Sequence, residues 1–167
     1  MILELDSSGL IGMVTMWGLI FSVVFYHLIE LSRKDRLYRY ADPKEWRPVW
    51  IAIIFPAVIT WCYVGVDHFW WIVGSFVWII ITYAAAFFKL MGGQDARVLI
   101  LAGVLFPHWL TIPLIFCGSL ILAHCQKKKL SAEELADWQL RGIPLIPYLF
   151  VCWVFAAVVY GIIVMIP

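Results

Sequence analysis

Two aspartates of this chain lie at the edges of long apolar segments. Asp95 belongs to the stretch Met91-Gly92-Gly93-Gln94-Asp95-Ala96-Arg97, which separates two almost wholly apolar runs, and Asp35 follows the first apolar run by four residues. A carboxylate at the boundary of a bilayer is costly to maintain, so an acid in this position is a candidate for function. Two such acids suit aspartyl proteolysis. One takes a proton from water while ionised, and the other, still protonated, hydrogen-bonds the peptide carbonyl.

The residues beside Asp95 fit this chemistry. Gly92 and Gly93 lack a Cβ, so we expect them to let an extended substrate strand approach the acid and to permit positive φ in the turn. Arg97 can reach lipid phosphates or influence the charge of Asp95. The other interpretation is structural: Asp35 is solvated and Asp95 is merely paired inside the protein.

The composition predicts an all-α integral membrane protein with a single domain, residues 1–167. Apolar residues make up 64% of the chain, charged residues 14%, and the mean hydropathy is +0.93, so the surface cannot be mainly polar. The apolar runs are long and separated by short polar stretches, which favours helices over barrel strands. The four cysteines form no C-x-x-C pair, and we interpret them as small buried hydrophobes.

About six transmembrane helices are expected, at residues 9–31, 48–64, 69–89, 96–106, 109–124 and 143–166. The first is about 34 Å long, enough to cross a bilayer. Six basic residues follow it between positions 32 and 47, which places this loop in the cytoplasm and the N-terminus outside. Two crossings separate Asp35 from Asp95, so both carboxylates return to the cytoplasmic face and can meet. Trp46 and Trp50 fit an interfacial belt at the start of the second span.

The fourth and fifth spans are expected to be short. A single helix over residues 96–123 would be about 42 Å long and would carry the lysines at 127–129 to the outside, against the charge rule. Phe106-Pro107-His108-Trp109 offers a break. The loop over residues 125–142 is then short and cytoplasmic, with one solvated amphipathic turn. Pro144 and Pro147 at the start of the last span leave backbone groups unpaired, which is tolerated where the chain lines a cavity or a partner supplies bonds.

Two stretches together resemble archaeal prepilin and preflagellin peptidases. Asp35-Arg36-Leu37-Tyr38-Arg39-Tyr40-Ala41-Asp42-Pro43-Lys44-Glu45-Trp46 is similar to the D-x-x-x-R-x-x-x-x-x-x-W segment of that family, and Gly92-Gly93-Gln94-Asp95-Ala96-Arg97 is similar to its G-x-G-D-x-K or G-G-x-D-x-K motif. Pro107, Pro144 and Pro147 recur where the family has prolines. The resemblance runs in order from about Ser32 to Tyr148.

This resemblance implies a multi-pass GxGD-type intramembrane aspartyl protease of the cytoplasmic membrane. Such an enzyme removes the basic leader of class III signal peptides from type IV pilin-like or archaellin precursors, without a cofactor or metal. The implied catalytic residues are Asp35 and Asp95, on an active-site loop with Gly92, Gly93, Gln94 and Arg97; Arg39, Pro144 and Pro147 are candidates to support the substrate. The partners are the precursors and the lipid bilayer, and nucleic acid is not expected, because the basic clusters are explained by orientation in the membrane.

The chain departs from the family pattern at several places. Gln94 stands at the second glycine of G-x-G-D, Arg97 replaces a lysine, and the loop over residues 125–142 is short where some relatives carry a soluble domain. The cysteine-rich N-terminal domain that bacterial relatives use for N-methylation is not expected, so no methyltransferase activity is predicted.

Other assignments remain open at this stage. Asp42 is the rival first acid, although its following proline suggests a turn or a helix cap. His27 and Glu30 lie one helical turn apart and suit a hydrogen-bonded pair, or else a proton relay or metal site. The alternative function is a small proton-coupled carrier or channel component that relays protons through Asp35, Asp95 and His27. A third possibility is an inactive homologue that acts as a scaffold.

Overall fold

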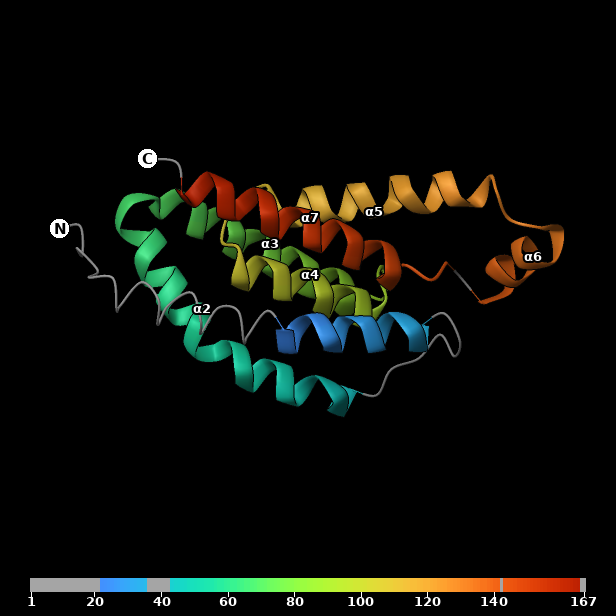
Figure 1. Cartoon of the computed structure of the whole chain (residues 1–167), viewed down its shortest axis with the longest axis horizontal. Coiled ribbons are helices and arrows are strands. Elements are labelled where there is room, and N and C mark those ends of the chain that lie inside the picture. Colours follow the sequence, from blue (N-terminus) through green and yellow to red (C-terminus); the bar gives the residue numbers. More distant parts are fainter. Residues whose placement is uncertain (1–21, 36–42, 142, 166–167) are drawn as a thin grey trace.

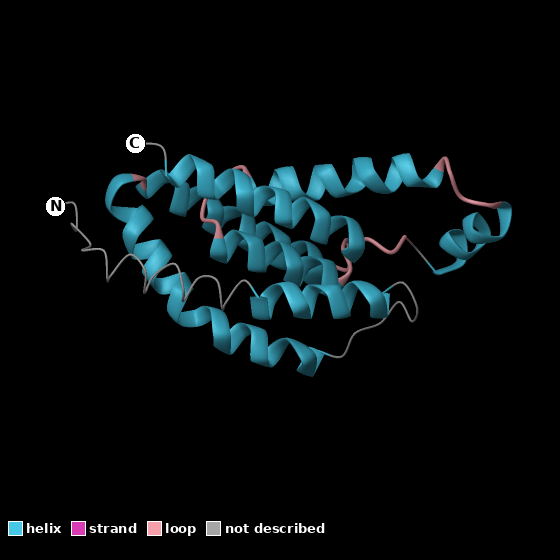
Figure 2. Cartoon of the chain, viewed as in Figure 1, coloured by secondary structure: helices cyan, strands magenta, loops and turns pink. Residues whose placement is uncertain are grey.

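The computed structural model describes residues 22–35, 43–141 and 143–165. Every regular element in these ranges is a helix, as Figure 2 shows. A helix over residues 22–35 comes first. It is followed by η1 (Pro43–Trp46), α2 (Arg47–Asp67), α3 (Phe69–Phe87), α4 (Gly93–Leu105), α5 (Thr111–Lys127), α6 (Ala132–Arg141) and α7 (Ile146–Met165). For this part of the chain, the prediction of an all-α fold is confirmed.

The long helices run back and forth along the long axis of the molecule (Figure 1). As a result, the last turn of the helix 22–35 and the first turns of α4 and α7 lie toward one end of the bundle. The α2–α3 turn and the loop from α4 to α5 lie toward the other end. The alternation expected from the sequence therefore holds for the described helices.

The helix boundaries differ from the predicted ones at two informative places. The fourth helix starts at Gly93 instead of residue 96, because the backbone N–H of Ala96 already donates to the carbonyl oxygen of Gly92 at 3.0 Å. Asp95 thus belongs to a helical turn instead of a loop. The expected amphipathic turn between the last two spans is a ten-residue helix, α6. The predicted break at Pro107 is confirmed, since it lies between α4 and α5. Residues 9–21 of the first predicted span lie outside the described residues.

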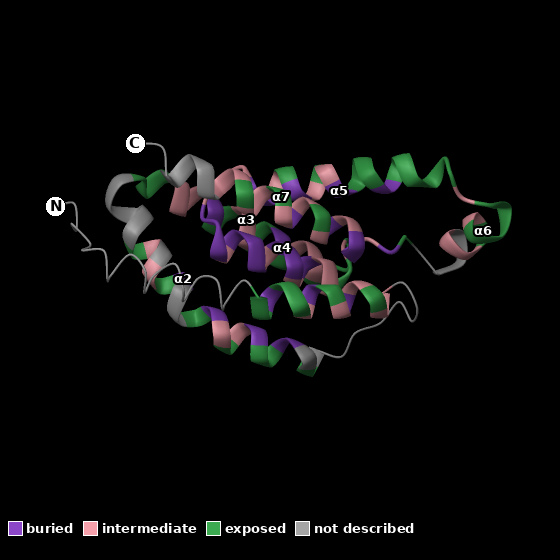
Figure 3. Ribbon diagram, viewed as in Figure 1, coloured by how far each residue is buried: buried purple, intermediate pink, exposed green. Residues whose placement is uncertain are grey.

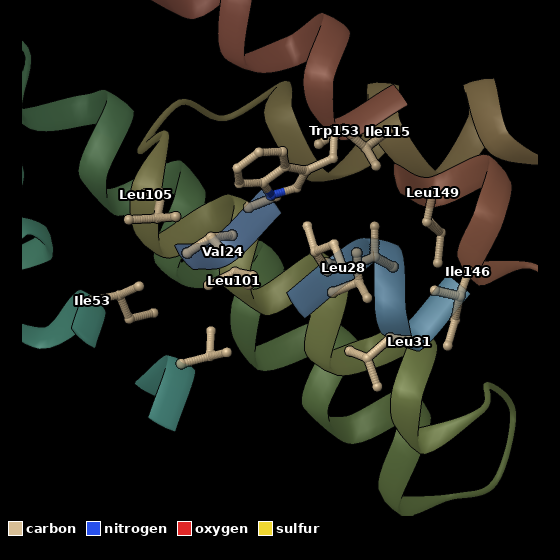
Figure 4. Packing of buried hydrophobic residues seen from close by; sticks show 14 of the residues in the cluster. Val24, Leu28, Leu31, Ile53, Leu101, Leu105, Ile115, Ile146, Leu149 and Trp153 are labelled. Carbon is tan, nitrogen blue, oxygen red and sulfur yellow. The ribbon is translucent and has the colours of Figure 1, made fainter. Parts of the chain in front are cut away.

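The buried apolar core surrounds α4, which is the most buried helix in Figure 3. Val98, Leu101 and Leu105 of α4 are at most 1% exposed. They pack in one cluster with side chains of the neighbouring helices, several of which are labelled in Figure 4: Val24, Leu28, Leu31, Ile53, Ile115, Ile146, Leu149 and Trp153. Burial of α4 among its neighbours holds Asp95, in its first turn, at a fixed place.

Small residues let α3 approach α4 closely. The Ser75 hydroxyl donates to the carbonyl oxygen of Gly103 at 2.8 Å. A Cβ on Gly103 would lie 2.7 Å from the Cδ1 atom of Ile112 and 3.1 Å from the Cγ1 atom of Ile79. Close packing through small residues and interhelical hydrogen bonds is typical of helices in membranes.

The helix α3 has the reverse of the pattern found in a water-soluble helix. Its two buried residues are the polar Ser75 and Thr82, whereas Trp70 is 76% exposed. In the described ranges, α3 is the one helix both long and apolar enough to cross a membrane. Two other helical stretches, Thr111–Lys127 and Ile146–Tyr160, are apolar but shorter.

The prediction that the cysteines are buried was wrong. Cys62, Cys117 and Cys125 are exposed and Cys152 is half-buried, and all four are free thiols. The three exposed cysteines lie on outward faces of apolar helices, where a small thiol is compatible with either a lipid or a protein environment. Cys152 of α7 instead packs beside Gly118 of α5.

Candidate aspartate site

Asp35 connects two elements that are far apart in the sequence. It is the last described residue of the helix 22–35, and its Oδ2 atom accepts a hydrogen bond from the backbone N–H of Ile146 at 3.3 Å. Ile146 begins α7, so this N–H is one of the donors that a helix start leaves without an intrahelical acceptor. The positive end of the α7 dipole also favours a negative charge here. Asp35 therefore supplies the hydrogen-bond acceptor that was expected for the backbone between the two prolines.

The two prolines of this segment are buried on either side of that bond. Pro144 and Pro147 flank Leu145 and Ile146, and the carbonyl oxygen of Leu145 accepts bonds from the N–H groups of Tyr148 and Leu149 at 3.0 Å each. The prolines supply no N–H of their own. The N–H of Ile146, which is directed to Asp35, is therefore the donor at the start of α7.

Asp95 lies in the first turn of α4, ahead of the apolar part of that helix. The pKa of Asp95 is raised from 3.8 to about 7. The larger cause is burial, and the second is the negative charge of Asp35. Both effects disfavour the ionised carboxylate. Asp95 therefore keeps its proton to a much higher pH than an exposed aspartate does.

The two predicted acids interact electrostatically. Asp35 and Asp95 are 60 positions apart in the sequence, yet the charge of one raises the pKa of the other. The helix turns that carry the two acids lie toward the same end of the bundle, as the order of the helices predicts. The two environments differ, because Asp35 accepts an N–H bond at a helix start and Asp95 is desolvated.

Gly92 makes room for the carboxylate of Asp95. A Cβ at Gly92 would lie 2.6 Å from the Oδ2 atom of Asp95, whereas a Cβ at Gly93 would meet nothing within 4 Å. The expected positive φ in these glycines was wrong: Gly92 has φ −61°, and the positive φ of this turn, 59°, is at Lys89. Lys89 occupies the left-handed position that ends α3, where the N–H of Leu90 bonds to the carbonyl oxygen of Ala85. Gly92 is needed for space and Gly93 leaves an open surface.

Gln94 joins α4 to the start of α2. Its Oε1 atom accepts a hydrogen bond from the indole N–H of Trp46 and another from the Nη1 of Arg97 at 3.4 Å. Trp46 is 1% exposed, so its predicted place in an interfacial belt was wrong. The tryptophan fills the core beside the site and is edge-on to the imidazole of His27 at 5.5 Å between ring centroids. The sequence did not predict that Trp46 holds Gln94. The available signal was that this tryptophan ends the segment that resembles the peptidase family.

Arg97 faces Gln94 and does not act on Asp95 as expected. Residues three apart share a helix face, whereas residues two apart do not, so Arg97 reaches Gln94 more readily than Asp95. The causes of the raised pKa of Asp95 are burial and Asp35, with no lowering by a guanidinium. The expected influence of Arg97 on the charge of Asp95 is therefore not seen.

Glu30 forms an ion pair with Arg33 at 3.4 Å, whereas the sequence predicted a pair between Glu30 and His27. Within the described ranges, no three His, Cys, Asp or Glu side chains gather as a metal site would require. Arg39 and Asp42, the possible substrate-supporting residue and the rival acid, lie outside the described residues.

Two clefts flank this end of the bundle. One, of about 390 Å³, lies between the helix 22–35 and α7 and is lined by Ile29, Ser32, Arg33, Pro147, Phe150 and Val151. The other, of about 470 Å³, lies under α6 and includes Glu133, Asp137, Trp138, Pro144 and Tyr148. Neither cleft is lined by Asp35 or Asp95, although each borders the proline segment that Asp35 holds.

Comparisons of the chain with protein-family models, with curated proteins and with solved structures gave no match.

Proposed function

We propose that the chain is a multi-pass aspartyl endopeptidase of the cytoplasmic membrane that cleaves the basic leader from type IV pilin-like or archaellin precursors. The observation that carries this proposal is the electrostatic interaction between Asp35 and Asp95, which come from different helices and differ in environment. Pairs of acids whose surroundings separate their proton affinities are suited to acid and base roles. The resemblance of the two motifs to prepilin and preflagellin peptidases supplies the substrate class.

The apolar exterior supports a membrane location. Large apolar side chains are exposed on α2, α3, α5 and α7, including Ile51, Phe87, Leu114 and Phe155, each more than 60% exposed. A water-soluble monomer rarely exposes contiguous apolar patches of this kind. The basic residues next to the helix 22–35 and after α5 then mark the cytoplasmic side, which is also the side of the two acids.

The two acids divide the chemistry between them. Asp35, bonded to the N–H of Ile146 at a helix start, is the ionised member and accepts a proton from the attacking water. Asp95, whose pKa is raised by burial and by Asp35, keeps its proton and donates a hydrogen bond to the scissile carbonyl oxygen. Water oxygen bonds to the carbonyl carbon, and collapse of the tetrahedral intermediate breaks the C–N bond as a proton passes to the leaving amine. The pair titrates as a unit.

The surroundings suit a peptide that continues into an apolar segment. Among the described residues, a Cβ at Gly93 would meet nothing within 4 Å, which is compatible with an extended backbone next to Asp95. The cleft between the helix 22–35 and α7 is largely apolar, with Arg33 at its edge, and it adjoins the Asp35 end of the site. An apolar substrate helix can lie in this cleft while the residues before it reach the acids.

Co-expression with a precursor tests the proposal. The precursor carries a basic leader and a glycine before its apolar helix, and cleavage is followed by its mobility shift. Asp35→Asn and Asp95→Asn are each expected to abolish the shift while the protein still inserts. Glu30→Gln, on the same helix as Asp35 but in an ion pair with Arg33, is the matched control and should cleave normally. Normal cleavage by either aspartate variant removes that residue from catalysis. A wild type that cleaves no such precursor favours the proton-coupled carrier or the scaffold.

A further inference from the structure

We propose that the cleft under α6 binds the basic leader of the precursor while Asp35 and Asp95 cleave the peptide next to it. This inference rests on the proposed function and deepens it, because it assigns the basic part of the substrate to a surface that neither aspartate lines. The cleft has a volume of about 470 Å³ and is formed by α6, the end of α5 and the start of α7.

One side of α6 supplies the charge of this cleft. With 3.6 residues per turn, the α6 residues that line it fall within about 140° of the helix circumference. They are Glu133, Glu134, Asp137 and Trp138. Among the described residues, the lining contains these three carboxylates and no lysine, arginine or histidine. The lysines at positions 127–129 do not line the cleft, so its charge is negative although the preceding loop is basic.

The carboxylates on this side of α6 suit a bound cation. Glu133 and Asp137 lie four positions apart, and like charges at that spacing repel each other on a helix. A cationic side chain between them is attracted to both. Glu134 also caps the helix, since its Oε2 atom accepts the N–H of Ser131 at 2.9 Å and the hydroxyl of Ser131 at 3.0 Å. These bonds lower the pKa of Glu134, so this carboxylate is ionised at neutral pH.

Two aromatic rings complete the cleft between α6 and α7. The ring centroids of Trp138 and Tyr148 are 6.4 Å apart, the ring planes are inclined by 71°, and both residues are half-buried. Ammonium and guanidinium groups are attracted to the faces of such rings. The apolar stems of lysine and arginine can pack against the same rings, which a metal ion cannot do. The combination of acids and aromatic rings therefore favours a basic peptide.

The cleft lies next to the aspartates. Pro144 lines the cleft, and two positions later the N–H of Ile146 donates to the Oδ2 atom of Asp35 at 3.3 Å. Two residues span at most about 7 Å, so a few residues of an extended peptide connect the cleft with Asp35. In Figure 1, α6 lies beyond the end of the bundle at which the helix 22–35 ends and α4 and α7 begin.

The order of the surfaces matches the order of the proposed substrate. The segment over residues 144–147 lies between the two clefts, because Pro144 lines the acidic cleft and Pro147 lines the apolar one. A precursor of this class has its basic leader, its cleavage position and its apolar helix in the same sequence. The match of charge and order identifies the leader as the occupant of the acidic cleft.

The test is direct binding of a leader peptide, measured without cleavage. A fluorescein-labelled peptide that contains the basic leader but no scissile bond is titrated with the full chain in an uncharged detergent, and the anisotropy gives Kd. Glu133→Gln combined with Asp137→Asn should weaken binding about 3- to 10-fold, since each exposed charge pair contributes modestly. Binding should also weaken as salt is added. A peptide with glutamate in place of each basic residue should not bind.

Matched variants locate the effect. Glu30→Gln removes a carboxylate from the helix 22–35, and Lys128→Gln removes a charge beside the cleft, and neither should weaken binding. Unchanged binding in the double variant overturns the proposal, as does an equal loss in Glu30→Gln. If the double variant does not fold, wild-type affinity of Glu133→Lys for the basic leader overturns it equally. Binding of calcium through Glu133 and Asp137 without binding of the leader also overturns it and makes the cleft a metal site.

Cleavage assays keep this proposal distinct from the proposed function. If the wild type cleaves the precursor, the double variant should raise KM about as much as Kd and leave kcat unchanged. An unchanged KM overturns the role of the cleft while the proposed function stands. If the wild type cleaves no precursor but binds the leader through Glu133 and Asp137, the proposed function fails while the cleft keeps its ligand.

Discussion

At the scale of single residues, the proton on Asp95 is determined by what surrounds the side chain. Burial removes water from the carboxylate, and Asp35 adds a second negative charge nearby, so the pKa rises to about 7. Asp35 has different surroundings, because it accepts an N–H bond at a helix start. The same residue type thus has two different environments within one site.

The first prediction concerns the pH dependence of cleavage and of stability. The proposed hydrolysis requires Asp95 to be protonated, so cleavage should fall as the pH rises above about 7. In the unfolded chain the pKa of Asp95 returns to about 3.8, so the folded protein binds the extra proton between these two values. Stability contributed by that proton is present below about pH 4 and is lost as the pH rises to 7.

Asp95→Asn checks the sign of this linkage, since asparagine cannot ionise. The variant should resist thermal unfolding in detergent better than the wild type at pH 8, by at most about 4 kcal/mol in free energy of unfolding. The difference should shrink toward pH 4. A variant less stable than the wild type at pH 8 would contradict the raised pKa.

The second prediction concerns the space at Gly92. Gly92→Ala places a methyl group 2.6 Å from the Oδ2 atom of Asp95, so the carboxylate must move. The φ of −61° and ψ of 134° at Gly92 suit alanine, so backbone strain does not contribute. A displaced catalytic group can lower the rate by about 100-fold. We expect a loss of that order in kcat, measured by precursor cleavage.

Gly93→Ala is the matched control for that experiment. A methyl group there meets nothing within 4 Å, and alanine favours the first turn of a helix more than glycine does. The control should keep the stability of the wild type or gain up to about 1 kcal/mol. Equal activity losses at Gly92 and Gly93 would show that substrate access, and not the position of Asp95, is the limiting factor.

At the scale of helices, the start of α7 depends on a side chain from the helix 22–35. The N–H of Ile146 bonds to Asp35, so Asp35→Ala leaves a part-buried donor without its acceptor. Asp35→Asn retains a side-chain oxygen at the same place. We expect both variants to be inactive, and Asp35→Ala to be less stable than Asp35→Asn by about 1–3 kcal/mol, measured by thermal unfolding. Equal stability would show that the bond to Ile146 contributes little.

The helices and their order could be predicted from the sequence because apolar runs and basic loops are strong signals. The second and third helices lie within three residues of their predicted limits. The start of α4 could not be predicted, because Gly92 and Gly93 suggest a loop, while the N–H bond from Ala96 to Gly92 already forms the first turn. The short α6 was expected as one turn, but Ser131 and Glu134 form the reciprocal bonds of a capping box at its N-terminus, a signal that the sequence contains.

The two acids of the candidate site could be predicted from the sequence, whereas the residues that hydrogen-bond around them could not. Two helices that run in opposite directions between Asp35 and Asp95, α2 and α3, were enough to place both acids toward one end. The bonds from Trp46 to Gln94 and from Ile146 to Asp35 join residues 48 and 111 positions apart, and spacing alone does not reveal such partners. The positive φ at Lys89 was likewise unexpected, because glycine is the usual residue in that conformation.

At the scale of the whole molecule, the back-and-forth course of the helices divides the chain between two ends. The acids and the lysines after α5 lie toward one end, and His68 and Trp109 lie in the turns toward the other (Figure 1). The proposed function requires that these ends face opposite sides of the membrane. The requirement is independent of any assay of cleavage.

The final prediction is the side from which each end can be labelled. Single cysteines at Lys128 and at His68, both exposed, are introduced after Cys62, Cys117, Cys125 and Cys152 are replaced by serine or alanine. In intact cells, a membrane-impermeant maleimide should label His68→Cys, and Lys128→Cys should react only after permeabilisation. Six basic residues between positions 32 and 47 favour this orientation, because such residues are retained in the cytoplasm. Lys34→Cys should behave like Lys128→Cys, since it adjoins Asp35. Labelling of Lys34→Cys and Lys128→Cys from opposite sides would place the acids away from the cytoplasmic lysines, and a basic leader in the cytoplasm could not then reach them.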